Sequence, residues 1–139
     1  MDRHKHHISR GFTLIEALLA VAIAAILASV ALPSYREQVA KGRRLSAQAK
    51  LYNAAQFMER FYTENHRYDQ DAAARAVVLP ESLRQSEDGT YTLRVITPDR
   101  DSYTVTATPT AAQLNDRCGA FSLSHTGLQS ASQPDCWRR

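Results

Sequence analysis

The sequence predicts an α+β fold in which one long N-terminal helix packs on an antiparallel sheet of three to four strands. An apolar run of membrane-spanning length continues into an amphipathic helical pattern. Two segments of alternating polar and apolar residues follow, joined by a short turn sequence. A cysteine pair, Cys118 and Cys136, lies near the C-terminus. Because the strands follow the helix rather than alternate with helices, the α+β class is favoured over the α/β class.

The apolar run extends from Phe12 to Leu32, and its only polar residues are Thr13, Glu16 and Ser29. As a helix it would be roughly 31 Å long, which is about the hydrocarbon thickness of a bilayer. A core helix of a protein this small would be amphipathic, whereas this run is apolar all round. The run therefore needs lipid or a multi-subunit protein core around it. A lone carboxylate deep in lipid costs a few kcal/mol, so Glu16 needs a specific reason to be there.

Residues 1–11 form a short basic leader with a net charge of +2. A secretory signal peptide would have a small-residue cleavage site after its apolar region, but "ALPSY" follows here and the helical pattern continues. The tract "HKHH" at His4–His7 has the composition of a metal-binding tract, and we interpret it as part of a soluble leader. Basic residues flank the run on both sides, so the positive-inside rule does not fix its orientation.

The sequence "GFTLIE", from Gly11 to Glu16, resembles the prepilin peptidase site of type IV pilins and pseudopilins. The resemblance implies that prepilin peptidase cleaves after Gly11 and that Phe12 becomes N-methylated. It implies that Glu16 pairs with the N-terminal amine of a neighbouring subunit. Pro33 stands where the family usually has a helix-disrupting proline. Many relatives have glycine where this chain has Ala25, and alanine is the better helix former, so we expect less unwinding ahead of Pro33 here.

The resemblance also predicts three segments. Residues 1–11 are the cleaved leader, and residues 12–35 are the half of the helix that spans the membrane and later lies in the filament core. Residues 36–139 form the headgroup, which includes the second half of the helix and lies in the periplasm and then on the filament surface.

Beyond Pro33 the pattern becomes amphipathic, and one stem helix is predicted from about Phe12 to Thr63. The apolar positions that should face the sheet follow 4-3-4-3 spacing: Ala47, Leu51, Ala54, Met58 and Phe61. The aromatic group Phe57, Phe61, Tyr62 and Tyr68 is predicted to lie in the core.

Residues 64–90 read as a long connection with one short helix at Asp71–Val77. The "DQD" sequence at Asp69–Asp71 lacks the glycine and distal glutamate of an EF-hand, and no metal site is expected. Alternating residues at 91–96 and 103–108, around the turn "PDRD" at 98–101, predict a hairpin. A third strand is expected at Ala120–Ser124, followed by a tail from Leu128 to Trp137.

The two cysteines close a loop near the end of a small domain, which is typical of a disulfide in an oxidising compartment. A bridge over a loop of this size contributes roughly 3 kcal/mol in the chain-entropy model. Two free thiols in the cytosol remain the alternative, whereas a zinc site would require further ligands that are missing nearby. A disulfide would place the C-terminal side of the apolar run in an oxidising space.

The ending "RCGAFSLSHTGLQSASQPDCW", after "SYTVTATPT", extends the resemblance over the whole chain. It is similar to a group of minor pilins that includes initiators of the twitching pilus and the competence pilin that captures DNA. The resemblance implies a pilus subunit with roles in assembly, adhesion, twitching motility and DNA uptake. Such a subunit is a single-pass inner-membrane protein before assembly and part of the extracellular pilus (fimbrium) afterwards. Its partners are prepilin peptidase, other pilin subunits, the inner-membrane assembly platform and the membrane.

No catalytic pattern stands out: the sequence has no P-loop, no GxGxxG and no GxSxG, so we expect neither an enzyme nor a cofactor. Two alternatives remain open. The first is a DNA-binding pilin, although residues 64–139 carry eight Arg against ten Asp or Glu, a balance that does not favour nucleic acid. The second is a type II secretion pseudopilin, which the cysteine loop disfavours. The candidate DNA-binding residues are Arg94, Arg100, Arg117, His125, Arg138 and Arg139.

Overall fold

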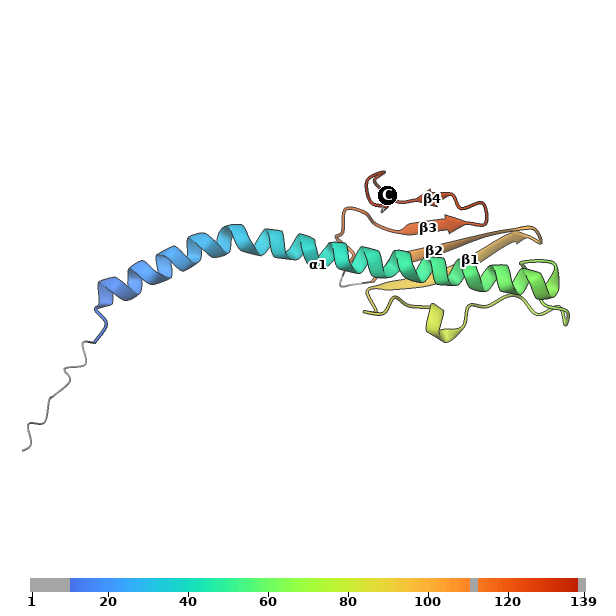
Figure 1. Cartoon of the computed structure of the whole chain (residues 1–139), viewed down its shortest axis with the longest axis horizontal. Helices are drawn as coiled ribbons and strands as arrows, with labels where there is room; N and C mark the ends of the chain where they lie inside the picture. The colour runs from blue at the N-terminus through green and yellow to red at the C-terminus, as the bar shows by residue number, and fades with distance from the viewer. Residues whose placement is uncertain (1–10, 111–112, 138–139) are drawn as a thin grey trace, which may run out of the picture. The chain divides into compact units, whose positions relative to one another are not determined.

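The computed structural model describes residues 11–110 and 113–137, and its elements follow the predicted order of one helix and then strands (Figure 1). Contacts divide the chain into two compact units with a boundary between Gln38 and Val39, and each unit is described by itself. The elements are helix α1 (Leu14–Asn65), the 3-10 helix η1 (Glu81–Leu83), and strands β1 (Tyr91–Asp99), β2 (Ser102–Pro109), β3 (Phe121–Ser124) and β4 (Gln129–Ser130).

The N-terminal unit contains the first part of α1, which begins at Leu14 rather than at the predicted Phe12. The helix continues through Pro33. Residues 11–36 are all exposed in the isolated chain, including large apolar side chains such as Ile15 and Val30. By length and composition, α1 is the one helix among the described residues that could cross a membrane. This apolar surface needs a surrounding that the isolated chain does not supply.

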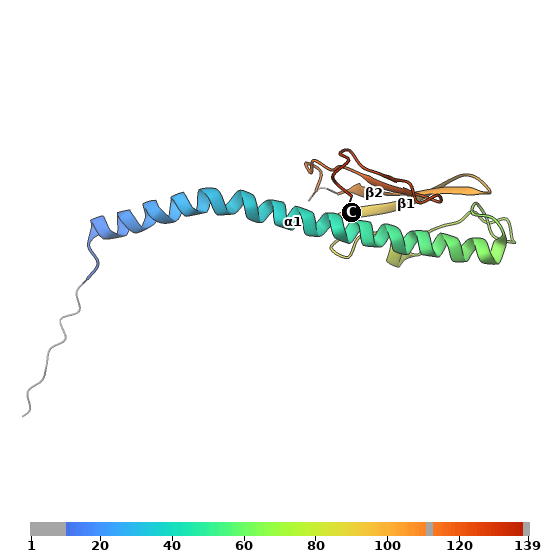
Figure 2. The same cartoon turned by 45° about the horizontal axis from the view of Figure 1, so that its top comes forward.

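The C-terminal unit has two layers, the second part of α1 and the antiparallel sheet that covers one of its faces (Figure 2). Four of the predicted core positions, Ala47, Leu51, Ala54 and Met58, are fully buried. Their 4-3-4 spacing aligns them along one side of the helix, because 3.6 residues make one turn. The amphipathic pattern therefore identified the packed face correctly.

The prediction for the aromatic group was wrong in part. Tyr68 is buried, but Phe57 and Phe61 are half-buried and Tyr62 is exposed. Tyr62 lies off the packed face of α1, where it contacts the Tyr68 ring at a centroid distance of 4.6 Å. A hydrophobic side chain beside the packed face covers the edge of the core rather than entering it.

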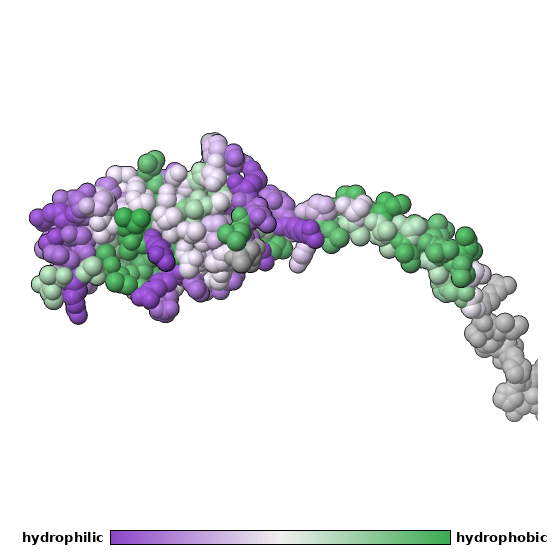
Figure 3. Space-filling view, turned by 180° about the vertical axis from the view of Figure 1, so that it is seen from behind, coloured by the Kyte–Doolittle hydropathy of each residue, from purple (hydrophilic) through white to green (hydrophobic). Residues whose placement is uncertain are grey.

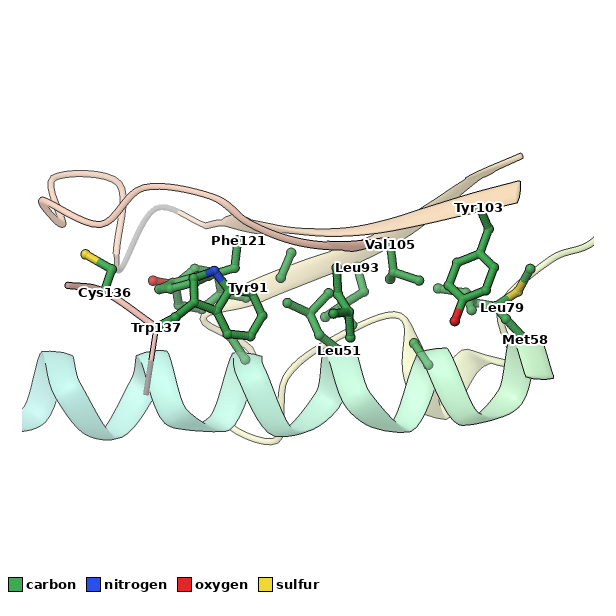
Figure 4. Close-up of a cluster of buried hydrophobic side chains, with 14 of the residues drawn as sticks. Leu51, Met58, Leu79, Tyr91, Leu93, Tyr103, Val105, Phe121, Cys136 and Trp137 are labelled. Carbon is green, nitrogen blue, oxygen red and sulfur yellow. The ribbon is translucent and has the colours of Figure 1, made fainter. Parts of the chain in front are cut away.

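The sheet has the order β1-β2-β3-β4, with every neighbouring pair antiparallel. The predicted hairpin is confirmed, with Leu93 opposite Ala107 and Val95 opposite Val105. The third strand begins at Phe121, one residue after the predicted start, and the predicted tail contributes the short strand β4. Side chains from one face of the sheet meet those of α1 and the C-terminal tail in a continuous core (Figure 4). The predicted α+β class with three to four strands is thus confirmed.

The short helix predicted at Asp71–Val77 was wrong, because the chain makes a tight turn there. The Asp71 carboxylate accepts hydrogen bonds from the backbone N–H groups of Ala73 and Arg75, both at 2.9 Å. Gln70 and Ala76 then pair as an isolated antiparallel bridge. An aspartate that caps a turn competes with helix formation, and seven residues are too few for a helix to form without tertiary support. The 3-10 helix η1 comes later, after Pro80.

Helix α1 ends at Asn65, two residues beyond the predicted end. His66 has a φ of 56° and donates its N–H to Tyr62 O at 2.7 Å, while Asn65 Nδ2 donates to Phe61 O at 2.9 Å. A residue in the left-handed region that satisfies the last carbonyls is a common way to end a helix.

Candidate functional site

The first turn of α1 brings Glu16 close to Thr13. The Glu16 N–H donates to Thr13 Oγ1 at 3.3 Å, and the Thr13 N–H reaches Glu16 Oε2 at 3.5 Å. A Thr followed three residues later by Glu is a capping box, in which each side chain satisfies a free N–H group of the other residue. These distances are long, so the carboxylate is only weakly held within its own chain. The sequence analysis did not predict this cap, although the T-x-x-E pattern contains the signal.

Apolar surface covers the N-terminal part of α1, in contrast to the mixed polar surface of the C-terminal unit (Figure 3). Phe12 is 80% exposed, and the apolar side chains that follow it are exposed as well. Such a surface, with one carboxylate at its start, suits packing against lipid or against copies of itself.

Two of the predicted DNA-binding residues, Arg100 and His125, lie at the same end of the sheet. Arg100 is in the β1–β2 turn, and His125 follows β3 and donates its N–H to Tyr103 O at 3.0 Å. Both side chains have acidic neighbours. Arg100 Nε is 3.6 Å from an Asp101 carboxylate oxygen. Hydrogen bonds from Ser102 and the Asp101 N–H, with a smaller contribution from His125, lower the pKa of Asp99. This end of the sheet thus carries basic groups without a large excess of positive charge.

A groove of about 270 Å³ adjoins His125, between α1 and β3. Tyr52, Gln56 and Glu59 line it from the helix, and Tyr103 and His125 line it from the sheet side. This groove combines aromatic walls with polar side chains, and the sequence analysis did not predict it because its two walls lie far apart in the chain.

Glu59, which lines this groove, is the acceptor of a pair of tyrosine hydroxyls. The hydroxyls of Tyr68 and Tyr103 donate to its carboxylate at 3.1 Å and 3.0 Å. Burial, followed by the hydrogen bond to Glu59, raises the pKa of Tyr68 to about 12 and also raises the pKa of Tyr103. Both tyrosines therefore act as neutral donors across the physiological range of pH.

Of the other predicted DNA-binding residues, the two that the structure describes, Arg94 and Arg117, do not join this group. Arg94 points to the outer face of the sheet, opposite Thr106, and is exposed. Arg117, directly before the cysteine loop, pairs with Asp135 in that loop at 2.9 Å. Arg138 and Arg139 lie outside the described residues, as does the leader tract His4–His7. The described members of the predicted set are therefore spread over the C-terminal unit rather than gathered in one patch.

The predicted disulfide between Cys118 and Cys136 is present, with a Cα–Cα distance of 5.7 Å. Its loop is held against α1 by two contacts that the sequence analysis did not predict. The Arg44 guanidinium binds the Asp116 carboxylate, with Nε 3.0 Å from both oxygens and Nη2 2.5 Å from one of them. Gln48 Nε2 donates to the carbonyl of Cys136 at 2.8 Å. These polar side chains lie on the packed face of the helix, where hydrophobic periodicity gives no signal.

The Arg44–Asp116 pair is almost completely buried. Burial by itself would raise the pKa of Asp116, but hydrogen bonds from Arg44 and from the Cys118 N–H outweigh it and lower that pKa. The carboxylate therefore stays ionised and links the helix to the start of the cysteine loop. Among residues 11–110 and 113–137 there is no group of three or more His, Cys, Asp or Glu side chains placed to hold a metal ion.

Two family models match the chain. The model for the prokaryotic N-terminal methylation motif matches residues 7–32. The model described as "Type IV minor pilin ComP, DNA uptake sequence receptor" matches residues 33–122, which is more than half of the chain. The chain belongs to this family of type IV minor pilins. The family is one of structural pilins, and the two matches together cover the apolar helix and most of the C-terminal unit of this pilin.

Two curated proteins are similar to this minor pilin in sequence. The type IV wide pilus major component PilA4 of Thermus thermophilus is 30% identical over 99 residues, which is 71% of this chain and 72% of that protein. The type IV major pilin PilA of Myxococcus xanthus is 36% identical over 73 residues, which is 52% of this chain and 33% of that protein. Both relatives are major pilins, so the similarity extends beyond the minor subunits.

Two solved structures are similar to this minor pilin in fold. A type IV pilin from Shewanella oneidensis matches with a TM-score of 0.52 and 30% identity, over 72% of this chain and 99% of that one. The non-core minor pilin PilV of Neisseria meningitidis matches with a TM-score of 0.54 and 18% identity, over 70% of this chain and 91% of that one. The second match bears on the fold alone.

Proposed function

We propose that this minor pilin is processed between Gly11 and Phe12 by prepilin peptidase, N-methylated on Phe12 and assembled into a type IV pilus. Before assembly, residues 12–35 anchor it in the inner membrane, and the headgroup at residues 36–139 lies in the periplasm. After assembly, the same helix lies in the filament core and the headgroup forms part of the extracellular surface. The observation that carries the proposal is the exposed apolar first part of α1, which begins within "GFTLIE" and has one carboxylate in its first turn.

Removal of residues 1–11 would create an amine on Phe12, one helical turn from Glu16. An ionised carboxylate near a helix N-terminus interacts favourably with the helix dipole, and an amine from a neighbouring copy would neutralise it. Because the cap to Thr13 is weak, Glu16 remains available to such a partner. A carboxylate that is costly in lipid then favours the move from the membrane into the filament. Pro33 removes one helical hydrogen bond, so the helix can bend at this point during that move.

The variant Glu16→Ala tests this pairing. It should insert into the membrane at the wild-type level, because the substitution makes the run more apolar, but it should be largely missing from sheared pili. The measurement is the amount of the pilin in membranes and in the sheared pilus fraction, with leader removal checked by mass. Thr13→Val is the matched control, because it removes the cap but keeps the carboxylate. If Glu16→Ala entered pili normally, or if Thr13→Val failed equally, the pairing role would be rejected.

A second function, DNA capture, is favoured by the matched family, whose description names a DNA uptake sequence receptor. We place the contact at the end of the sheet that carries Arg100 and His125, beside the aromatic groove that His125 lines. Arginine contacts to phosphates supply affinity that depends on salt, and aromatic walls accept base faces. The same family match favours a pilin over a secretion pseudopilin.

DNA binding can be measured by fluorescence anisotropy with the full chain in detergent micelles over a series of salt concentrations. Each lost phosphate contact should reduce the slope of log K against log salt by about 0.9 for duplex DNA. Arg100→Ala should therefore show a shallower slope and weaker binding at low salt. Arg117→Ala is the control, because Arg117 lies directly before the cysteine loop and pairs with Asp135 within it. Absence of binding at low salt, or equal losses in both variants, would argue against capture at this site.

A further inference from the structure

The part of α1 that directly follows the apolar run is rich in basic residues. Residues 36–45 carry one acidic side chain, Glu37, and four basic ones, Arg36, Lys41, Arg43 and Arg44. The positive-inside rule gathers Lys and Arg on the cytoplasmic flank of a membrane span. This flank leads instead to the unit that contains the disulfide, which is typical of an oxidising compartment. The positive charge here therefore needs a reason other than membrane topology.

The fold accounts for two of these four basic residues. Arg44 is buried and binds Asp116. Arg43 is half-buried, and its Nη1 donates to Gln113 Oε1 at 3.3 Å. Arg36 and Lys41 are exposed, and neither makes a hydrogen bond or an ion pair with residues 11–110 or 113–137. Their charges are therefore available to a partner outside the described chain.

A large apolar side chain lies near these basic residues. The connection from β2 to β3 is held against α1, because Gln113 Nε2 donates to Ala40 O at 3.4 Å (Figure 1). Gln113 itself is buried, but the next residue, Leu114, is 63% exposed. An exposed aliphatic side chain beside basic ones is the combination that binds the surface of an anionic membrane.

The position of these residues along α1 brings them within reach of a bilayer surface. Tyr35 is exposed and follows the apolar run, where aromatic side chains sit at the membrane–water interface. At about 1.5 Å of rise per residue, Arg36 lies about 6 Å and Ala40 about 12 Å beyond Leu32 along the helix. The polar layer on each side of a bilayer is roughly 5–8 Å thick. Extended Lys and Arg side chains can reach back to it.

We propose that anionic phospholipids of the membrane that holds the anchor bind a basal surface, formed by Arg36, Lys41 and Leu114, and so seat the C-terminal unit on the bilayer before assembly. The two basic side chains bind lipid phosphate groups, and Leu114 enters the interfacial layer. Since a filament core offers no lipid, this contact is broken when the pilin leaves the membrane, and anionic lipid therefore favours the unassembled state. The inference rests on the proposed anchor at residues 12–35 and is independent of the Glu16 pairing and of DNA binding.

Seating is measured with the full chain in vesicles of phosphatidylcholine alone and of phosphatidylcholine mixed with phosphatidylglycerol. A fluorophore on Asn115→Cys reports the position of the connection, because the two native cysteines are paired. Lipids that carry a nitroxide on the phosphate side quench the fluorophore when it lies at the bilayer surface, and fluorescence lifetimes give the ratio of quenched to unquenched molecules. This ratio should be higher in the mixed vesicles, and high salt should remove the difference.

Three variants test the residues of the basal surface. A basic side chain near an anionic surface contributes about a factor of five to binding, so Arg36→Gln and Lys41→Gln should each lower the ratio about fivefold in mixed vesicles. Neither should change it in phosphatidylcholine vesicles. Leu114→Asn should lower it in both kinds of vesicle, because its contribution does not depend on lipid charge. Arg60→Gln is the matched control, since Arg60 is exposed on α1 about 28 Å beyond Lys41, well beyond the screening length of about 8 Å.

Alkaline extraction of the same vesicles separates failure of this inference from failure of the anchor. Wild-type pilin should resist extraction in both kinds of vesicle, and so should the variants, because residues 12–35 are unchanged. A pilin that alkali removes has no anchor, which would overturn the proposed anchoring and this inference together. A pilin that stays in the vesicles but shows equal quenching in both kinds, or loses as much in Arg60→Gln as in Lys41→Gln, would overturn this inference alone. The basic pair would then serve contacts between subunits.

Discussion

Single residues in this pilin show how one type of side chain serves different purposes in different surroundings. Glu16 is an exposed carboxylate in an apolar helix, where only a weak cap holds it. Asp116 is a buried carboxylate that Arg44 binds from α1. The first is available to a neighbouring molecule, whereas the second is fully committed within the chain. Substitution of Asp116 or its partner should therefore affect the fold, and substitution of Glu16 should affect assembly.

Arg44→Ala should destabilise the C-terminal unit by about 3–5 kcal/mol, because it leaves an unpaired carboxylate in the core. The measurement is urea unfolding of the full chain in detergent, followed by Trp137 fluorescence. Arg117→Ala, which breaks the exposed pair with Asp135, is the control and should show no comparable loss. Equal stability of the two variants would contradict the role given to the buried pair.

The same pair predicts a pH dependence. The folded-state pKa of Asp116 is lowered, so its contribution is fully present above the unfolded value of about 3.9. The contribution is lost as the pH falls through the lower, folded-state pKa, because the protonated carboxyl no longer pairs with Arg44. Wild-type stability should thus decline on acidification below about pH 4, and Arg44→Ala should show a smaller decline from this site.

Among the elements, the sequence predicted those with a repeating side-chain pattern and missed those that depend on single specific contacts. The 4-3-4 spacing from Ala47 to Met58 identified the packed face of α1, and the alternation around "PDRD" identified the hairpin. The helix predicted at Asp71–Val77 failed, because the turn there depends on a single carboxylate bonding its own backbone. The groove beside His125 joins segments of α1 and the sheet that lie far apart in the chain, and no local pattern indicates it.

At the scale of the molecule, the two units differ in where their apolar side chains lie. The C-terminal unit buries its apolar side chains in its own core and closes its tail with the Cys118–Cys136 disulfide. The N-terminal unit exposes its apolar side chains and needs lipid or other subunits around them. This difference fits a protein that is anchored in a membrane first and enters a filament afterwards, with the leader removed in between.

The intact mass of the pilin, extracted from membranes and from sheared pili, tests this sequence of events most directly. In cells with active prepilin peptidase, the mass should correspond to residues 12–139 with one added methyl group and an intact disulfide. In cells that lack the peptidase, residues 1–11 should remain. A mass that retains residues 1–11 in cells with active peptidase would contradict the processing at Gly11–Phe12.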